Sequence, residues 1–575
     1  MFRDLLQPFR RDYAKYLSGT VVRQALLVLG GYSMVWAMRI CLAHRTIPEW
    51  WLIIALVVFD SLFLGLDISL NSLYTRRLSF PLFARLRTSA LRKVFDMPLQ
   101  WHQQQTSGAL VAKVNNGVGR VVQTAEALSR ELCPSVIRTL MTLVPLLIFS
   151  LMTAPVLLVA LLIFGCLTIV ENKRRANFRK GRHEKYVRDS GVFSEYVQSV
   201  QPVIQFGQTG RLLDEYTRLQ QQIMDQGVAE IEVANRFAWR KNMVLSAAKR
   251  ICQGMWIWQL RKGSTDVAMV MYLNMLTEDL LGSFWGYASL LERVYEGLEP
   301  TKTLLHLLEE PSEITDAPDA VPVPVPERVG IQLENVRFSY SRGKHVIHDF
   351  NLAIEEGKVL GVVGRSGSGK TTIQSLLSRL FDVDEGHIRV CGTDIRKWPL
   401  KQLRGVFAYV SQAGGVFLSG STILDTIRFA RPQSTFREVV EAAKCACIHD
   451  DITRMPRKYH ARMRQGGANL SKGQQQRLAL AQALLALKDD RKVVVLDEFT
   501  SQLDSETETR ILRNIVPWLA GRTVIIIAHR LSTVRHVADE IVVLEEGAIV
   551  EQGSHQELVD RNGWYAEMAR LQAVI

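Results

Sequence analysis

Gly364-Arg365-Ser366-Gly367-Ser368-Gly369-Lys370-Thr371 follows an apolar run, Val359 to Val363, and opens a helical pattern that continues through Thr372. This is the order strand, glycine loop, helix, with the G-x-x-x-x-G-K-[ST] spacing of a phosphate-binding loop. The glycines let backbone N–H groups curl around a polyphosphate. Lys370 adds a positive charge for the outer phosphates, and Thr371 offers a hydroxyl ligand to Mg²⁺. The sequence therefore predicts an α/β P-loop domain that binds ATP or GTP.

Polar residues follow three further strand-like runs downstream of this loop. Asp497 and Glu498 end the run that begins at Val493, His529 follows the run that begins at Thr523, and Gln412 follows the run Ala408 to Ser411. Ligands of parallel sheets collect at the carboxyl ends of the strands, so these side chains are expected at one edge of the sheet. Asp497 suits Mg²⁺, and Glu498 suits an attacking water. A fourth segment precedes a Leu- and Ala-rich helix: Leu470-Ser471-Lys472-Gly473-Gln474.

These motifs stand in the order found in the ATP-binding cassette (ABC) family, which this chain resembles over essentially its whole length. The resemblance implies that Glu498 is the catalytic carboxylate, His529 the switch histidine, and Gln412 the Q-loop residue that contacts Mg²⁺ and senses the membrane domain. It also implies adenine stacking by Tyr340. Two loops complete the implied site: a signature loop, Leu470 to Gln474, for ATP held by a partner subunit, and a D-loop with Ser501 and Asp504.

Four positions depart from the family pattern. Lys472 stands where the signature usually has Gly, and Phe499 replaces the usual small residue or proline after the Asp-Glu pair. Gln502 replaces Ala in the D-loop, and Gln465 replaces a Glu before the signature. None of these changes removes a catalytic group. We therefore expect ATP hydrolysis with Mg²⁺.

The chain is long and apolar enough for a large membrane part. It has 575 residues, of which 47% are hydrophobic, and a formal net charge of +13. In a membrane protein this charge indicates a cytosolic bias of basic residues and not nucleic-acid binding. The seven cysteines form no disulfide framework. Six segments approach the roughly 20 residues needed to cross a bilayer: Val21 to Leu42, Trp50 to Tyr74, Cys133 to Met152, Pro155 to Val170, Phe237 to Leu260 and Val267 to Leu291.

The predicted fold is an α-helical membrane domain of six spans with long cytosolic extensions, followed by an α/β P-loop cassette with a helical subdomain. We expect a transmembrane domain at residues 1–310, a linker at 311–330 and the cassette at 331–575. In the resembled family the extensions carry short coupling helices, for which the candidates are Asn115 to Val122 and Gln201 to Phe206. Six spans place the cassette and both termini in the cytosol. The expected location is a bacterial inner membrane.

Charged residues within the spans are candidates for a substrate cavity, because an intramembrane charge is costly unless paired or hydrated. The candidates are Asp60, Lys249, Arg250, Glu278 and Asp279. Three interpretations stay open: contact with an anionic or metal-chelating cargo, ion pairing between neighbouring spans, or a register that places the charges at the cytosolic interface.

The expected function is ATP-driven export of an amphipathic small molecule or lipid by a dimer. One P-loop and one signature in the chain imply a second half-transporter, and Lys472 favours a non-identical partner. The first alternative is import of a metal–siderophore complex as one half of a heterodimer. An ATP-gated channel or regulator is a further alternative, which intact Glu498 and His529 disfavour.

Overall fold

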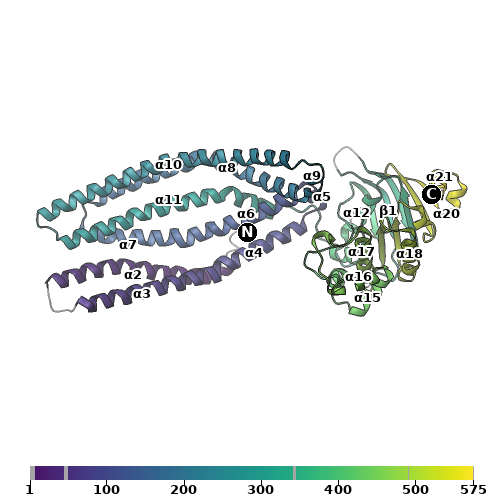
Figure 1. The fold of residues 1–575 in the computed structure, drawn as a ribbon, viewed down its shortest axis with the longest axis horizontal. Helices are drawn as coiled ribbons and strands as arrows, with labels where there is room; N and C mark the ends of the chain where they lie inside the picture. The colour runs from purple at the N-terminus through teal and green to yellow at the C-terminus, as the bar shows by residue number, and fades with distance from the viewer. Residues whose placement is uncertain (1–6, 44–48, 341–344, 413, 490, 574–575) are drawn as a thin grey trace. The chain divides into compact units, whose positions relative to one another are not determined.

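The computed structural model describes residues 7–43, 49–340, 345–412, 414–489 and 491–573 (Figure 1). The chain divides into two compact units. Unit 1 comprises residues 1–95 and 103–311, and unit 2 comprises residues 96–102 and 312–575. The described part of unit 1 is helical, whereas unit 2 combines helices with two sheets.

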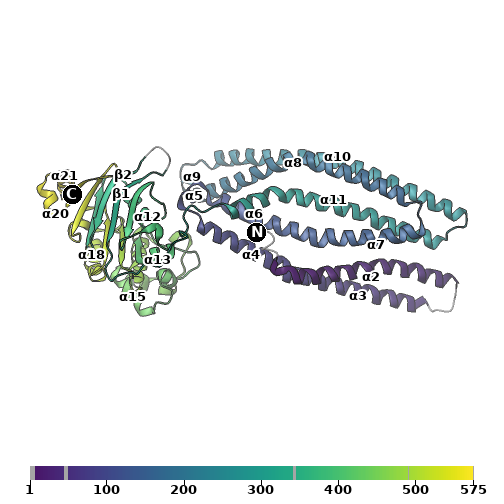
Figure 2. The same ribbon diagram turned by 180° about the vertical axis from the view of Figure 1, so that it is seen from behind.

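Long antiparallel helices make up unit 1, seen from two sides in Figures 1 and 2. A π-helical turn, Thr75–Ser79, joins α3 to α4, and a second, Leu128–Leu132, joins α6 to α7. The helices are α2 (Arg10–Ala43), α3 (Glu49–Tyr74), α4 (Phe80–Asp96), α6 (Ser107–Ala127), α7 (Cys133–Phe149), α8 (Ala154–Gln198), α9 (Val200–Gln205), α10 (Thr209–Arg261) and α11 (Val267–Glu309).

The hairpin between α10 and α11 shows how local sequence ends and starts these helices. Gly263 has a φ of +71°, in the left-handed region that glycine adopts without strain. Asp266 then caps α11, because its side chain accepts a hydrogen bond from the Met269 N–H at 2.7 Å. Trp256 of α10 and Phe284 of α11 are both fully buried in the apolar core of unit 1. Capping and burial together align the two helices.

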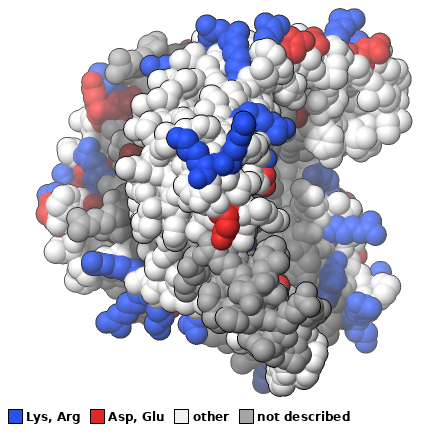
Figure 3. Space-filling model, turned by 90° about the vertical axis from the view of Figure 1, so that its left-hand side faces the viewer, with Lys and Arg blue, Asp and Glu red and all other residues white. Residues whose placement is uncertain are grey.

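Three described helical stretches are long and apolar enough to cross a membrane: Val57–Asp96, Ser107–Phe149 and Ala154–Gln198. The other expected spans also lie in helices, α2, α10 and α11, but the number of six spans stays a prediction. Figure 3 views the end of unit 1 where α10 turns into α11, and Lys and Arg side chains and an acidic side chain stand out there against a mostly uncharged surface.

The short helices between the long ones correct one expectation. Gln201 to Phe206 overlaps the short helix α9, but Asn115 to Val122 lies in the interior of the long helix α6. The short helix before α6 is α5, Leu99–Gln104, which follows Pro98 and was not expected from the sequence. Apolar periodicity alone did not separate α5 from its neighbours. Residues 96–102, assigned by sequence to the transmembrane domain, cluster with unit 2.

Two sheets form the framework of unit 2. The first has the antiparallel order β2-β1-β4-β5, built from β1 (Ile331–Phe338), β2 (Ile347–Ile354), β4 (Glu385–Val390) and β5 (Thr393–Asp394). The second has the order β10-β9-β3-β8-β7-β6. Its strands are β3 (Val359–Gly364), β6 (Phe407–Val410), β7 (Val493–Asp497), β8 (Thr523–Ile527), β9 (Glu540–Glu545) and the antiparallel edge strand β10 (Ala548–Gly553).

Helices pack on these sheets and form a helical layer around α15 and α17, below the sheets in Figure 1. The central strands β7 and β8 are buried at every position, because both faces of the sheet are covered. The helices are α12 (Lys370–Leu377), α13 (Leu400–Val406), α14 (Ile423–Ile427), α15 (Phe436–Cys445), α16 (His449–Arg454), α17 (Lys472–Ala486), α18 (Ser505–Leu519), α19 (Leu531–Arg535), α20 (His555–Asp560) and α21 (Trp564–Ala573).

Candidate functional site

The predicted phosphate-binding loop connects β3 to α12. Gly367 and Gly369 have φ angles of +84° and +101°, which side-chain-bearing residues rarely adopt. A Cβ on Gly369 would lie 2.6 Å from Ile347 Cδ1. Buried Lys370 Nζ donates to the carbonyls of Gly364 at 2.8 Å and Arg365 at 2.7 Å, so the loop is closed around the ammonium group. Burial lowers the pKa of Lys370.

The remaining loop residues differ in exposure. Arg365, Ser366 and Thr371 are exposed, whereas Ser368 and Thr372 are buried. Tyr340 lies beside the loop, since its hydroxyl is 3.1 Å from Thr372 Oγ1. The Tyr340 ring makes edge contacts with Phe338 and Phe381, at centroid distances of 4.9 and 5.2 Å. These contacts fix the orientation of the ring that we expect to meet adenine.

Asp497 is the last residue of β7 and is 1% exposed. Among the described residues, neither of its carboxylate oxygens has a hydrogen-bond partner. Burial, together with the neighbouring charge of Glu498, raises the pKa of Asp497 to about 6, against the opposing effects of Lys370 and the nearby Thr371 hydroxyl. A buried carboxylate without donors is costly. This pair of oxygens therefore fits a bound divalent cation, which would supply the missing positive charge.

Glu498, the next residue, is held between two predicted partners from other strands. His529 Nε2 lies 2.8 Å from Glu498 Oε1, and Gln412 Nε2 donates to Glu498 Oε2 at 3.0 Å. Glu498 has a φ of +48°, and its N–H donates to the Ile527 carbonyl at 2.9 Å. Such left-handed geometry in a non-glycine residue costs on the order of 1–3 kcal/mol and clusters at functional sites. A cavity of about 10 Å³, roughly the size of one water, adjoins Glu498 and His529.

The predicted signature loop lies at the N-terminus of α17. Ser471 accepts a hydrogen bond from the Gln474 N–H at 3.2 Å, and Gln474 Oε1 accepts one from the Ser471 N–H at 3.0 Å. This capping box fixes the loop while leaving Ser471 and Lys472 exposed. Leu470 is buried beneath them. A Cβ on Gly473 would approach the Gln502 carbonyl at 3.1 Å, so glycine allows close contact with the D-loop.

Gln476 is a site residue that the motif analysis missed. Its Nε2 donates to the Glu498 carbonyl at 2.7 Å and to Ser501 Oγ at 2.9 Å. Its Oε1 accepts from the Gln502 N–H at 3.0 Å. Gln476 thus ties α17 to the segment that carries Glu498. The available signal was its position in the first turns of α17, two residues after the signature loop.

Phe499, which departs from the family pattern, and the D-loop residue Asp504 both have structural explanations. Phe499 is fully buried in the core that includes α15 and α17, so its ring fills space behind the site. Asp504 caps α18 by accepting from the Thr507 N–H at 2.8 Å. The capping contact gives Asp504 a local structural role beside the D-loop role implied by the resemblance.

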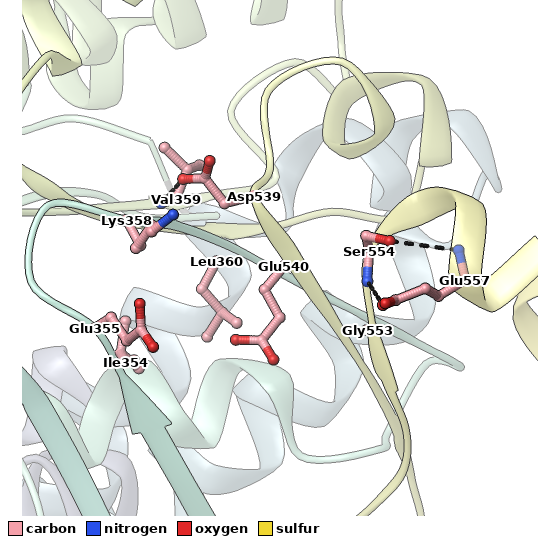
Figure 4. A pocket seen from close by; sticks show the side chains of 10 residues that line it. All are labelled: Ile354, Glu355, Lys358, Val359, Leu360, Asp539, Glu540, Gly553, Ser554 and Glu557. Atoms are coloured by element: carbon pink, nitrogen blue, oxygen red, sulfur yellow. Dashed lines mark hydrogen bonds between the residues drawn. The ribbon is translucent and has the colours of Figure 1, made fainter.

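A separate cavity of about 270 Å³ lies at the opposite end of the parallel sheet (Figure 4). It is lined by Lys358 and Val359 at the start of β3 and by Asp539 and Glu540 at the start of β9. The phosphate-binding loop follows the other end of β3. This cavity is therefore distinct from the candidate ATP site.

The predicted cavity residues of unit 1 are not gathered into one cluster. Lys249 of α10 and Glu278 of α11 form an ion pair, Nζ to Oε1, at 2.5 Å, which supports the pairing interpretation for these two. Exposed Arg250 donates to Gln253, on its own helix, at 3.0 Å. Asp60 is exposed on α3, and Asp279 is half-buried on α11.

A buried charge cluster in unit 1 was missed. Glu230 of α10, 1% exposed, lies 2.9 Å from Arg175 Nη2, 3.2 Å from Arg179 Nε and 2.7 Å from Arg182 Nη1, all on α8. Glu171 of the same helix lies 2.7 Å from Lys241 Nζ. The available signal was the spacing of residues 171, 175 and 179, four apart and therefore on one face of a helix.

Comparisons with known proteins bear on both units. Residues 347–501 match the ABC transporter model, and residues 19–283 match the ABC transporter transmembrane region model. The chain is 29% identical over 504 residues to an ATP-dependent lipid A-core flippase of Legionella pneumophila, covering 85% of this chain and 81% of the relative. It is 30% identical over 518 residues to the multidrug resistance-like ATP-binding protein MdlA of Escherichia coli, covering 86% and 82%.

A solved structure, that of a bacterial Atm1-family ABC exporter with ATP bound, matches with a TM-score of 0.88 and 25% identity. The match covers 99% of this chain and 98% of that chain. Two adjacent family models and a similar relative matched over most of its length agree with the motifs described above. This chain therefore belongs to the ABC transporter family, as a membrane protein with a transmembrane region followed by an ATP-binding cassette, and it is an ATPase coupled to transport.

Proposed function

We propose that this chain exports a lipid or another amphipathic molecule, using ATP hydrolysis at Glu498. The observation that carries the hydrolytic part is the convergence of Gln412, Glu498 and His529 from three strand ends, at 2.8 and 3.0 Å. A structural loop has no need to hold a carboxylate with left-handed backbone geometry between two polar partners. The same arrangement suits a carboxylate that accepts a proton from an attacking water.

Each cassette residue has a distinct part in this proposal. Backbone N–H groups of residues 364–369 and Lys370 bind the phosphates, and the Tyr340 ring stacks on adenine. Asp497, Thr371 and Gln412 would hold Mg²⁺, and the bound ion would neutralise charge that develops on the phosphates. Glu498 orients the water and takes its proton. His529 holds the Glu498 side chain in a fixed position relative to the outer phosphate.

The relatives support export of amphipathic cargo. Their names describe a lipid A-core flippase, a multidrug resistance-like protein and an Atm1-family exporter. None of these names favours import of a metal–siderophore complex. The retained hydrolytic residues Glu498 and His529 favour a pump over an ATP-gated channel.

The proposed working unit is a dimer of half-transporters. The signature loop at Ser471 and the phosphate-binding loop at Lys370 are each present once, so two composite sites require a second cassette. We favour a non-identical partner, because Lys472 replaces the usual signature glycine. We place the transporter in a bacterial inner membrane, with six spans per chain and with the cassette and both termini in the cytosol.

The test is the Glu498→Gln substitution, with Glu506→Gln as matched control because Glu506 is 84% exposed on α18. Both proteins are reconstituted in liposomes that contain a fluorescent lipid, and ATP hydrolysis and lipid movement are measured together. We expect Glu498→Gln to lower turnover at least about 100-fold while retaining ATP binding, and to stop lipid movement. Unchanged turnover would exclude Glu498 as the catalytic carboxylate. ATP turnover by the parent protein without movement of lipids or amphipathic drugs would exclude the proposed cargo class.

A further inference from the structure

Gln572, near the end of α21, is hydrogen-bonded to the backbone of the segment that carries His529. Its Nε2 donates to the His529 carbonyl at 3.1 Å, and its Oε1 accepts from the Leu531 N–H at 2.7 Å. The two ends of one amide group thus hold backbone groups on both sides of Arg530. No sequence motif contains Gln572.

Glu508, on α18, holds the same segment from another side. It is 5% exposed, although it carries an ionisable carboxylate. Its Oε1 accepts from Thr533 Oγ1 at 2.5 Å and from Thr500 Oγ1 at 3.1 Å, and its Oε2 accepts from Arg530 Nη1 at 3.1 Å. Thr500 follows Glu498 by two residues. One buried carboxylate therefore connects the segment after Glu498 to the segment after His529.

The histidine segment needs such restraints. It comprises residues 528–530, between the end of β8 at Ile527 and the start of α19 at Leu531. The His529 side chain is 42% exposed, so packing alone does not fix it. Yet its Nε2 must remain within hydrogen-bond distance of Glu498. A backbone that is restrained on both sides of His529 leaves the side chain fewer conformations, so less conformational entropy is lost when His529 aligns with Glu498.

We propose that Gln572 and Glu508 are positioning residues for ATP hydrolysis. They hold the histidine segment, residues 528–530, and the start of α19 up to Thr533, so that His529 stays within hydrogen-bond distance of Glu498. The C-terminal helix α21 is thereby part of the hydrolytic apparatus. This inference rests on the proposed roles of Glu498 and His529. It adds two residues that act through His529 without touching nucleotide.

The test uses the full-length protein with two variants and two matched controls. Gln572→Ala removes both amide contacts, and its control is Gln556→Ala, because Gln556 donates a hydrogen bond to Asp560 on its own helix α20. Glu508→Gln removes the charge opposite Arg530, and its control is Glu506→Gln. We expect kcat to fall about tenfold in Gln572→Ala and Glu508→Gln with KM for ATP unchanged. The controls should retain parental kcat.

A double-mutant cycle separates positioning from a general loss of stability. His529→Ala alone should lower single-turnover hydrolysis, and adding Gln572→Ala should lower it no further. Equal fold-losses with and without His529 would overturn the inference, as would unchanged kcat in Gln572→Ala. If His529→Ala does not change the rate of hydrolysis, the proposed role of His529 in the hydrolytic site is wrong, and the positioning proposal is wrong with it.

A second readout does not depend on activity. Hydrogen exchange of the Leu531 amide should accelerate in nucleotide-free Gln572→Ala, because this N–H donates to Gln572. Exchange in Gln556→Ala should match the parent. If Glu508→Gln does not fold, the Gln572→Ala variant alone tests the proposal. Unchanged hydrogen exchange of the Leu531 amide in that variant would contradict the proposed restraint by Gln572.

Discussion

At the scale of single residues, Asp497 and Glu498 are adjacent in sequence but occupy different environments. Asp497 is buried with no hydrogen-bond partner among the described residues, whereas Glu498 has two partners. Asp497 is the last residue of β7, whereas Glu498 lies just beyond the strand and outside its extended geometry. The left-handed backbone at Glu498 then turns its side chain toward His529 and Gln412. Two identical functional groups can therefore serve different roles.

The first prediction concerns the pH dependence of stability in the absence of nucleotide and Mg²⁺. The pKa of Asp497 is raised from 3.8 to about 6, so the folded state binds a proton more tightly than the unfolded state. Its contribution to stability is therefore complete below about pH 4 and is lost as pH rises through about 6. Asp497→Asn should raise the free energy of unfolding by about 2–3 kcal/mol at pH 8 and by little at pH 4.

Thermal unfolding of the detergent-solubilised protein with chelator checks this prediction. Excess Mg²⁺ and ATP should stabilise the parent at pH 8 more than the Asn variant. A stability difference that does not change with pH would contradict the assigned environment of Asp497.

At the scale of elements, the charge cluster of unit 1 joins three helices. Arg175 of α8 lies 2.9 Å from Glu230 of α10 and 2.6 Å from Glu292 of α11. Lys241 of α10 lies 4.9 Å from the Trp285 ring centroid of α11. Charges this buried are costly unless every member is paired. The cluster therefore favours one arrangement of α8, α10 and α11 over alternatives that leave a charge unpaired.

The second prediction follows from this pairing. Glu230→Ala removes the buried carboxylate shared by Arg175, Arg179 and Arg182, and leaves Arg179 and Arg182 with only distant carboxylates, at 3.8 and 3.9 Å among the described residues. We expect a loss of about 3–5 kcal/mol in stability, measured as a large drop in thermal unfolding temperature in detergent. Glu232→Ala is the matched control on the same helix, because Glu232 is 63% exposed and should change stability by less than about 0.5 kcal/mol. Similar melting of the two variants would contradict a structural role for the cluster.

The third prediction distinguishes pairing from cargo contact at Lys249 and Glu278. If their ion pair joins α10 to α11, each charge reversal alone should weaken transport, and the double variant Lys249→Glu, Glu278→Lys should restore it. Arg250→Met serves as a comparison, since the Arg250 guanidinium donates a hydrogen bond to Gln253 on its own helix and not across to α11. Cargo-stimulated ATPase in liposomes is the measurement. A double variant as impaired as the single ones favours direct contact with cargo at Lys249.

At the scale of the whole molecule, the proposed non-identical partner gives the fourth prediction. The purified chain alone should hydrolyse ATP slowly, because Lys472 sits at the exposed start of α17 where the signature usually has glycine. Lys472→Gly should raise turnover of the chain alone several-fold, with Lys488→Gly as a control on an exposed position beyond the other end of that helix. Robust turnover of the unmodified chain by itself would exclude the need for a different partner.

The sequence alone was sufficient for the ABC fold class, the phosphate-binding loop and the strand-end residues Gln412, Glu498 and His529. The loop and the strand-end residues depend on local rules: glycines with left-handed geometry, continuous apolar runs for buried strands, and polar residues at strand ends. The ABC class came from the resemblance that the order of these motifs carries. The structure brings the three strand-end residues together. Family comparison then confirms the class and the transport function, whereas the number of six spans, the site roles and the partner remain predictions.

Tertiary structure alone decided the rest. Gln476, Glu508 and Gln572 contact the segments that carry Glu498 and His529 from three helices. Gln476 lies beside a recognised motif, but no local pattern distinguishes Glu508 and Gln572 from other polar helix residues. The spacing of Arg175 and Arg179 places them on one helix face, but their pairing with Glu230 of α10 depends on long-range contacts. The short helix α5 was missed because apolar periodicity does not separate it from its neighbours. Side-chain identity reports what a residue can do locally. Which residue it contacts depends on how segments that are distant in the sequence pack together, and the residues beside it in the sequence do not reveal that packing.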